Sequence, residues 1–179
     1  MANEFIMPNH IIVGEGSLEK SKSYFEKLGK KALIVTDNSM VNLGNTLILA
    51  KVLNDININY SIYSEINSEP TNKMIEDGVN IFKDEQCDFL IGFGGGSSID
   101  SAKAIGIMVS NPGEISTYMK NKILNKPNGI VAIPTTAGTG SEATKFTIIT
   151  NTENDIKMLI KGECLIPNVH CCIRSRNSI

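Results

Sequence analysis

The sequence predicts an α/β fold, a Rossmann-like and mostly parallel sheet flanked by helices. The first observation is that short apolar runs alternate with longer amphipathic segments, which is typical of βαβ units. The second is that two of the apolar runs lead directly into turns rich in glycine or threonine. The third is size, because 179 residues with 41% hydrophobic content can bury the core of one compact domain.

The N-terminal part of the chain is expected to begin the sheet at its edge. Residues 5–13 predict an edge strand, and residues 17–28 predict a helix that begins with a serine cap and ends before a glycine. Residues 32–36 predict a buried strand, because the unbroken apolar run 32–35 is followed by one threonine and then by Asp37. The next expected elements are a helix at 47–53, a half-exposed strand at 60–63 and a helix at 70–85.

The C-terminal part is expected to continue the sheet and then leave it. Residues 89–93 predict a buried strand, 98–110 a helix, and 130–134 another core strand. The polar stretch 111–128 between them predicts a surface connection with a short helix. Alternating residues on both sides of a polar turn predict a β-hairpin near residues 146–160.

A glycine turn between a buried strand and a helix predicts an anion site. Gly94, Gly95, Gly96 and Ser97 occupy this turn, where missing Cβ atoms let backbone N–H groups approach a phosphate at the positive end of the helix. The near match to GxGxxG is weak alone, and it follows a later strand than in the usual dinucleotide fold. Ser97 and Asp100 also have capping-box spacing, which is a structural alternative for both residues.

Two further polar groups follow core strands. Asp37 is placed to accept both hydroxyls of an adenosine ribose and to repel a 2′-phosphate, which favours NAD over NADP, unless it only caps a loop. The segment after residue 134 is a second polar loop that can form hydrogen bonds with ribose, amide or phosphate, although such hydroxyls also stabilise turns. Its hydroxyl residues are Thr135, Thr136, Thr139, Ser141 and Thr144.

Several functions are disfavoured by composition. A net charge of −2 with scattered lysines predicts no nucleic-acid partner, and no apolar run reaches the roughly 20 residues of a membrane span. The polar N-terminus does not resemble a signal peptide, so we expect a cytoplasmic protein. The four cysteines lack disulfide spacing, Cys87 is expected to be buried, and His10 and His170 belong to no catalytic or metal-ligating group. No catalytic residue and no metal ligand is therefore predicted within this sequence.

Two segments together resemble a known family. Residues 94–103 read GGGSSIDSAK and residues 133–144 read IPTTAGTGSEAT, and this pair resembles the iron-containing (group III) alcohol dehydrogenases, relatives of glycerol dehydrogenase and dehydroquinate synthase. The resemblance covers residues 5 to about 169. It implies a dehydroquinate synthase-like N-terminal domain that binds NAD, followed by an all-helical domain that holds divalent iron or zinc. It also implies hydride transfer between a primary alcohol or aldehyde substrate and nicotinamide.

The resemblance also implies roles for individual residues. Asp37 would bind the adenosine ribose, and Gly95, Gly96 and Ser97 would bind the pyrophosphate, with Gly94 and Asp100 in the same motif. Lys157 would lie near the nicotinamide ribose, and the threonines Thr135, Thr136, Thr139 and Thr144 would line the adenine and nicotinamide ends. Glu69 stands where some members have asparagine, which leaves that contact open.

The sequence departs from the family after Val169. We expect a nucleotide-binding domain at 1–169, an aberrant tail at 170–179 and no C-terminal metal domain, and a frameshift near Val169 is our hypothesis for the tail. The expected product is a cofactor-binding fragment without turnover, with exposed apolar surface and possible homo-oligomers. The alternatives are a free-standing nucleotide-binding or regulatory module, or a glycerol or sugar-phosphate enzyme of the same superfamily.

Overall fold

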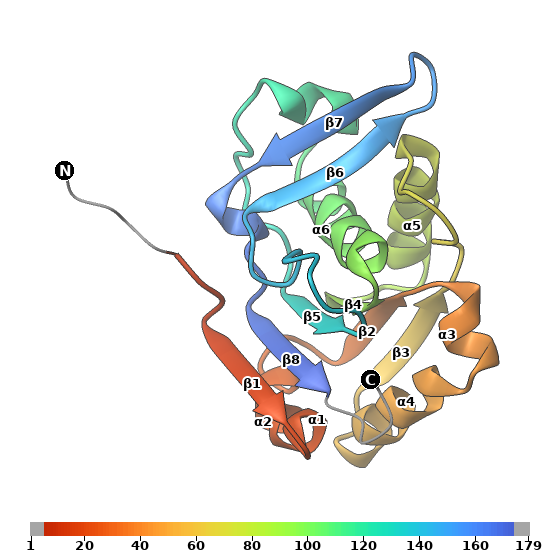
Figure 1. Ribbon diagram of the computed structural model, residues 1–179, viewed down its shortest axis with the longest axis vertical. Helices are drawn as coiled ribbons and strands as arrows, with labels where there is room; N and C mark the ends of the chain where they lie inside the picture. The colour runs from red at the N-terminus through yellow and green to blue at the C-terminus, as the bar shows by residue number, and fades with distance from the viewer. Residues whose placement is uncertain (1–5, 174–179) are drawn as a thin grey trace.

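A six-stranded parallel sheet forms the centre of the molecule (Figure 1). The structure is a computed structural model, and it describes residues 6–173. The strand order is β1-β8-β5-β4-β2-β3, and every neighbouring pair is parallel, as the alternation of apolar and amphipathic segments predicted. The strands are β1 (His10–Gly14), β2 (Lys31–Val35), β3 (Asn59–Tyr63), β4 (Phe89–Gly94), β5 (Ile130–Pro134) and β8 (Val169–Ile173).

Helices cover both faces of this sheet. The α-helices are α1 (Ser17–Lys20), α2 (Lys22–Phe25), α3 (Asn38–Asn42), α4 (Asn45–Asp55), α5 (Asn72–Asp84) and α6 (Gly96–Ser110), and the 3₁₀ turns are η1 (Ile115–Met119) and η2 (Glu163–Leu165). On one face α5 and α6 pack in a core that includes Leu33 and Leu90. On the other face Phe25 and Leu53 pack against Phe89 in a second core. The strands between these two cores are buried on both faces, which explains their unbroken apolar runs.

The predicted hairpin is confirmed as a separate two-stranded sheet. Strands β6 (Phe146–Asn151) and β7 (Ile156–Lys161) pair antiparallel and lie over α6 (Figure 1). On the inner face of the hairpin, the side chains of Thr147, Ile149 and Met158 are buried. The opposite face of the hairpin leaves Phe146 and Leu159 partly exposed.

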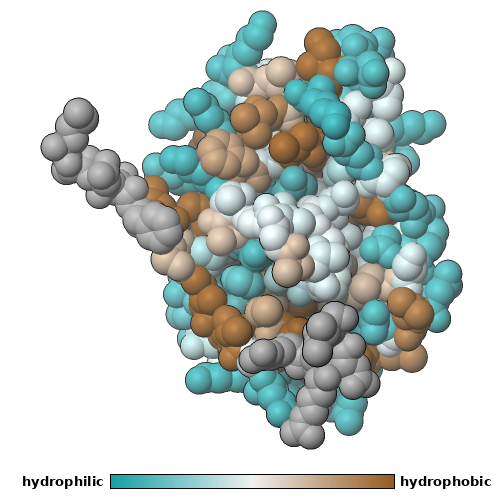
Figure 2. All heavy atoms as spheres, viewed as in Figure 1, coloured by the Kyte–Doolittle hydropathy of each residue, from teal (hydrophilic) through white to brown (hydrophobic). Residues whose placement is uncertain are grey.

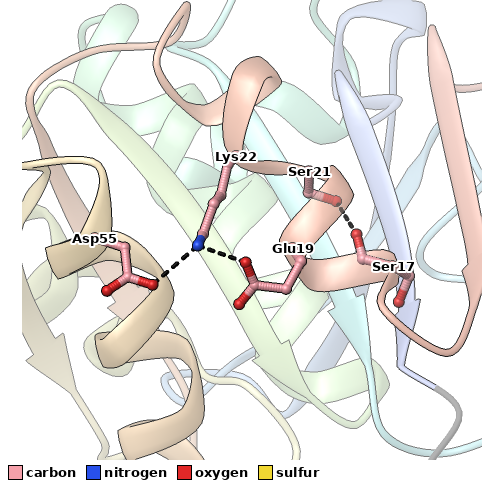
Figure 3. Close-up of polar contacts among 5 residues, drawn as sticks. All are labelled: Ser17, Glu19, Ser21, Lys22 and Asp55. Atoms are coloured by element: carbon pink, nitrogen blue, oxygen red, sulfur yellow. Dashed lines mark hydrogen bonds and ion pairs between the residues drawn. The ribbon is translucent and has the colours of Figure 1, made fainter.

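The helix predicted at 17–28 is broken in two (Figure 3). The Ser21 hydroxyl donates to the Ser17 carbonyl at 2.8 Å, a local bond that competes with regular helix geometry. The expected serine cap is wrong, because Gly16 occupies the cap position and no side chain caps the helix. Lys22 bridges Glu19 and Asp55 of α4, and these bonds raise the pKa of Lys22.

The first residues after Val169 lie inside the sheet. Strand β8 runs through residue 173 between β1 and β5, so this part of the expected tail has a regular place in the fold. The Ser17 hydroxyl donates to the Cys172 carbonyl at 2.9 Å and fixes α1 to this strand. The rest of the expected tail, 174–179, lies outside the described residues, and the frameshift stays a hypothesis. No helix within residues 6–173 is both long enough and apolar enough to cross a membrane.

Candidate nucleotide-binding site

A cleft of about 460 Å³ opens at the carboxyl edge of the sheet between β2 and β4. The chain passes from β2 outward to β3 at one edge and returns to β4 on the other side of β2. Open parallel sheets bind ligands at such a reversal of strand order, outside the carboxyl ends of the strands. The cleft is lined by residues that follow three strands: Asp37, Ser39, Met40, Ile66, Asn67, Ser68, Gly95, Gly96, Ser97 and Ser98.

A larger hollow of about 720 Å³ lies elsewhere, beside β1 and α1. It is lined by residues such as His10, Ser17 and Tyr24, and none of the predicted site residues is among them. It opens beside the edge strand of the sheet and not at the strand-order reversal. The smaller cleft is therefore the candidate functional site.

The glycine turn presents the start of α6 to the cleft. The helix begins at Gly96 and its N-cap is Gly95, so no side chain caps the first backbone N–H groups. The capping box considered as an alternative for Ser97 and Asp100 therefore does not form. Ser97 lies within the first turn instead, and the uncapped N–H groups keep the partial positive charge of the helix end available to an anion.

The glycines at this turn are required by close approaches. Gly94 has φ of 144°, a conformation that L side chains rarely adopt, and a Cβ there would lie 2.8 Å from Ser98 Oγ. The same Cβ would lie 3.4 Å from Asp37 Oδ2, which places that carboxylate beside the turn. A Cβ on Gly96 would lie 3.1 Å from Thr139 Cβ. The glycines thus let the loops after β2, β4 and β5 meet.

Asp37 caps the short helix α3 at the end of β2. Its Oδ1 accepts from the Met40 backbone N–H at 3.0 Å. The capping role that was the alternative for Asp37 therefore applies to this oxygen. Its Oδ2 is the atom that lies near Gly94. Across the cleft, the Asn67 side-chain oxygen accepts from the Asn38 N–H at 2.9 Å and joins the loops after β2 and β3.

The threonine loop, residues 135–145, begins at the glycine turn. The Thr135 N–H donates to the Gly94 carbonyl at 2.9 Å, extending the β4–β5 pairing into the loop. Thr136 lies near Gly95, at 3.6 Å from the position of a Cβ there, and the side chains of Thr135, Thr136 and Thr139 are exposed. Thr144 lies at the far end of the loop, where its methyl group approaches Gly140. The loop therefore faces the glycine turn mainly through Thr136 and Thr139.

The Asp100 carboxylate joins α6 to the hairpin and to Ser141 of the threonine loop. Its Oδ2 accepts from the Ile148 N–H at 3.3 Å, and burial raises the pKa of its carboxyl group despite the nearby ammonium of Lys103. Lys103 was not predicted as a site residue. It is fully buried, burial lowers its pKa to about 8, and its Nζ donates to the carbonyls of Thr144 and Phe146. The neighbours Ala102, Ala104 and Ile105 were the available sequence signal that Lys103 is buried, but not of what it contacts.

Lys157 lies on β7 and is not among the residues that line the cleft. Its Nζ forms an ion pair with Glu69 Oε1 at 2.7 Å, which raises the pKa of Lys157. Both side chains are exposed, at 65% and 51% of their surface. Glu69, for which a contact with the dinucleotide was left open, is thus paired with Lys157 in this structure.

No metal-binding cluster is present among residues 6–173. No group of three or more His, Cys, Asp or Glu side chains there could hold a metal ion. His170 on β8 has two buried ring nitrogens without hydrogen-bond partners, and burial lowers its pKa. Cys87 is buried as expected, and burial raises its pKa to about 11, so the thiol stays protonated at neutral pH.

Comparison with known proteins gives this geometry a family. Residues 8–172 match the family described as iron-containing alcohol dehydrogenase. The chain is 39% identical over 171 residues to the NAD-dependent methanol dehydrogenase of Bacillus methanolicus, covering 94% of this chain and 45% of that protein. It is 38% identical over 167 residues to alcohol dehydrogenase 4 of Saccharomyces cerevisiae, covering 92% and 44%. The chain thus spans about half the length of these curated relatives.

Solved structures agree with the sequence match. A crystal structure of 1,3-propanediol oxidoreductase superposes with a TM-score of 0.92 at 32% identity, over 96% of this chain and 46% of that one. A sulfoacetaldehyde reductase from Bifidobacterium kashiwanohense in complex with NAD⁺ superposes with a TM-score of 0.84 at 25% identity, again over 96% and 46%. The dehydroquinate synthase-like, Rossmann-like fold expected from the sequence is therefore the fold of these enzymes over the matched part, and the chain belongs to the iron-containing alcohol dehydrogenase family.

Proposed function

We propose that this chain forms the NAD-binding part of an iron-containing alcohol dehydrogenase, with the dinucleotide in the cleft between β2 and β4. One observation carries the proposal. The start of α6 is uncapped and opens into that cleft, while the Asp37 carboxylate lies beside the same turn. A helix end with free N–H groups attracts phosphate, and a carboxylate nearby suits ribose hydroxyls, so together they suit a dinucleotide.

The residues in the cleft fit this ligand. The first turn of α6, from Gly95 through Ser97, would hold the pyrophosphate, because no Cβ at Gly95 or Gly96 prevents a close approach to the backbone. Asp37 would accept from the adenosine ribose through the oxygen that does not cap α3. Thr135, Thr136 and Thr139 are not among the residues that line this cleft, and from the adjacent threonine loop their exposed side chains would reach the adenine and nicotinamide ends.

Three predicted contacts have weaker support. Thr144 and Asp100 lie toward the hairpin, where a Thr144 backbone atom and the Asp100 side chain already have hydrogen-bond partners. Lys157 is paired with Glu69 and would have to exchange this partner to reach a nicotinamide ribose. We keep these roles as proposals, with Asp100 assigned first to holding β6 against α6.

The chemistry would be oxidation of an alcohol or reduction of an aldehyde. When bound, NAD supplies the hydride acceptor or, in its reduced form, the donor. The chain's own contribution is to fix the dinucleotide: α6 neutralises the pyrophosphate charge, Asp37 orients the adenosine half, and the threonine loop limits water access and positions the other half. The described residues do not fit a divalent metal, since they offer no cluster of ligands, so we assign no step to one here.

The substrate is proposed to be a small primary alcohol or aldehyde. Similar proteins are named for different compounds: methanol, 1,3-propanediol, choline and sulfoacetaldehyde. Because these names differ although the matched region is shared, we propose that the nucleotide-binding half does not select the substrate. NAD is preferred over NADP because the carboxylate of Asp37 would repel a 2′-phosphate.

Location and assembly follow as further proposals. All four cysteines are free, which suits a reducing compartment such as the cytoplasm. Hydrophobic side chains gather over the hairpin and along β1, including Ile11, Val13, Phe146 and Leu159 (Figure 2). Exposed patches of this kind favour association, so we propose a homo-oligomer.

Calorimetric titration of the purified chain with NAD, NADP and ADP-ribose tests the cofactor assignment. We expect NAD and ADP-ribose to bind with similar affinity and NADP to bind more weakly. The proposed function would be contradicted if none of the three ligands gave binding heat and none competed with another for the chain. Circular dichroism must show in that case that the chain is folded.

A further inference from the structure

Lys103 is the one charged side chain that is fully buried in the described part of the chain. It lies on α6 two turns after the glycine turn, on the side that faces the hairpin. Burying an ammonium group is costly unless its hydrogen bonds are satisfied. The lowered pKa of Lys103, about 8, reflects that cost. A charge at this position therefore needs a structural or functional reason.

The partners of Lys103 lie at the end of the threonine loop. Its Nζ donates to the Thr144 carbonyl at 2.8 Å and to the Phe146 carbonyl at 2.9 Å. Thr144 is near the end of the loop, and Phe146 is the first residue of β6. Both acceptors are more than 40 residues away in sequence, so these bonds join two separate elements.

Two other hydrogen bonds extend the same junction. The Thr147 hydroxyl donates to the Asp100 carbonyl at 2.8 Å, and the Ile148 N–H donates to the Asp100 carboxylate at 3.3 Å. The charged groups that interact with Lys103 are the carboxylates of Asp100 on α6 and Glu142 in the loop. Of the two charged residues on α6, Asp100 and Lys103, only Lys103 donates a hydrogen bond to a backbone carbonyl of the loop.

The loop is thus held at both ends to the β4–α6 unit. Its first residue bonds to the Gly94 carbonyl, and its end bonds to Lys103. Between these points Thr139 and Ser141 approach Gly96, at 3.1 Å and 3.2 Å from the position of a Cβ there. The distance between the loop and the glycine turn therefore depends on where the loop end is held.

We propose that Lys103 is a positioning residue that holds the end of the threonine loop on α6 and so sets how closely this loop packs against the glycine turn. The inference rests on the proposed function, because the glycine turn that the loop contacts is where the pyrophosphate would bind. Lys103 itself touches no part of the proposed ligand. It acts through the backbone at Thr144 and Phe146.

The first arm of the experiment measures the loop without any ligand. The chain contains no tryptophan, so the A137W substitution at an exposed loop position gives a single fluorescent reporter. We expect K103M in this background to increase acrylamide quenching and to lower the anisotropy of the reporter. Methionine keeps the length and apolar stem of lysine and removes the donors.

The second arm measures the NAD dissociation constant by calorimetry. K103M should weaken binding by about tenfold or more, the loss expected when a charge-assisted hydrogen bond no longer orders a binding wall. I58A is the control for stability alone, because Ile58 is buried immediately before β3 and the substitution leaves Lys103 in place. We expect I58A to lower the melting temperature and to bind NAD as the wild type does. If K103M does not fold, K103Q replaces it.

The outcomes separate the two proposals. If the wild type fails to bind NAD while K103M still increases the quenching and lowers the anisotropy of the reporter, the proposed function fails and the positioning role in the loop stands. If a folded K103M or K103Q leaves both the reporter and the NAD dissociation constant unchanged, the positioning role is wrong. If I58A weakens NAD binding as much as the Lys103 variants do, the effect is one of stability and the inference is also overturned.

Discussion

Substituting Gly95 with serine should raise stability and weaken NAD binding at the same time. Gly95 is the N-cap of α6, with φ of −75° and ψ of −176°, the extended conformation in which a serine hydroxyl accepts from the N–H groups two and three residues later. There is room for the new side chain, since a Cβ would lie no closer than 3.6 Å to Thr136 Oγ1. The serine would therefore occupy the N–H groups of Ser97 and Ser98 that the pyrophosphate needs.

The two effects have different sizes. Serine at an N-cap is better than glycine by a few tenths of a kcal/mol, so the free energy of unfolding should rise slightly. Each hydrogen bond to a charged phosphate contributes about 1.5 to 3 kcal/mol, so losing one should raise the NAD dissociation constant by about tenfold to 150-fold. A general loss of stability cannot produce these opposite signs.

Urea unfolding and calorimetric titration of G95S measure the two quantities. T71A is the matched control, because Thr71 caps α5 through its bond from the Met74 N–H and is not among the residues lining the cleft. It should lower the free energy of unfolding by about 1 kcal/mol and leave NAD binding unchanged. Unchanged or tighter NAD binding by G95S would refute the assignment of the pyrophosphate to the start of α6.

Three other predictions follow from the same geometry. D37S keeps a side chain that can cap α3 but removes the negative charge, so the ratio of NADP to NAD dissociation constants should fall by about tenfold; an unchanged ratio argues against Asp37 as the ribose partner. Lys103 has a pKa of about 8 when folded and 10.5 when unfolded, so the unfolded chain binds more protons between these pH values. The free energy of unfolding of the wild type relative to K103M should then rise by up to about 3 kcal/mol from pH 8 to pH 10.5 in urea titrations, and a flat difference would contradict the buried charge. Because residues 6–173 contain no metal cluster, the purified chain with NAD, a primary alcohol and added Fe²⁺ or Zn²⁺ should form no NADH by absorbance, and alcohol-dependent NADH formation would disprove this.

The central strands could be predicted from the sequence because burial on both faces makes them continuously apolar. The runs at 32–36, 89–93 and 130–134 became β2, β4 and β5 with small shifts at their ends. The hairpin was also predictable, because one face packs on α6 and the other is exposed, which produces alternation. Strand β8 was missed, since His170 interrupts its apolar residues, although residues 169–173 pair with β1 and residues 169 and 170 also pair with β5.

The parts of the candidate site that consist of a single strand and the turn after it could also be predicted from the sequence. The glycine turn and Asp37 each follow a strand, and parallel strands bring their carboxyl ends to one edge. The bond from Ile148 to Asp100 could not be foreseen, because capping-box spacing also fits a residue that bonds to a distant β-strand. Lys103 was missed for a similar reason: its acceptors are backbone carbonyls of residues 144 and 146, and nothing in the local sequence indicates such a contact.

A crystal structure of this chain with NAD would test the central claim most directly. The account predicts pyrophosphate oxygens within hydrogen-bond distance of the N–H groups at the start of α6, with the adenosine ribose on Asp37 and the threonine loop on the opposite side. NAD bound elsewhere, for example in the hollow beside β1 and α1, with the start of α6 free of phosphate, would contradict it.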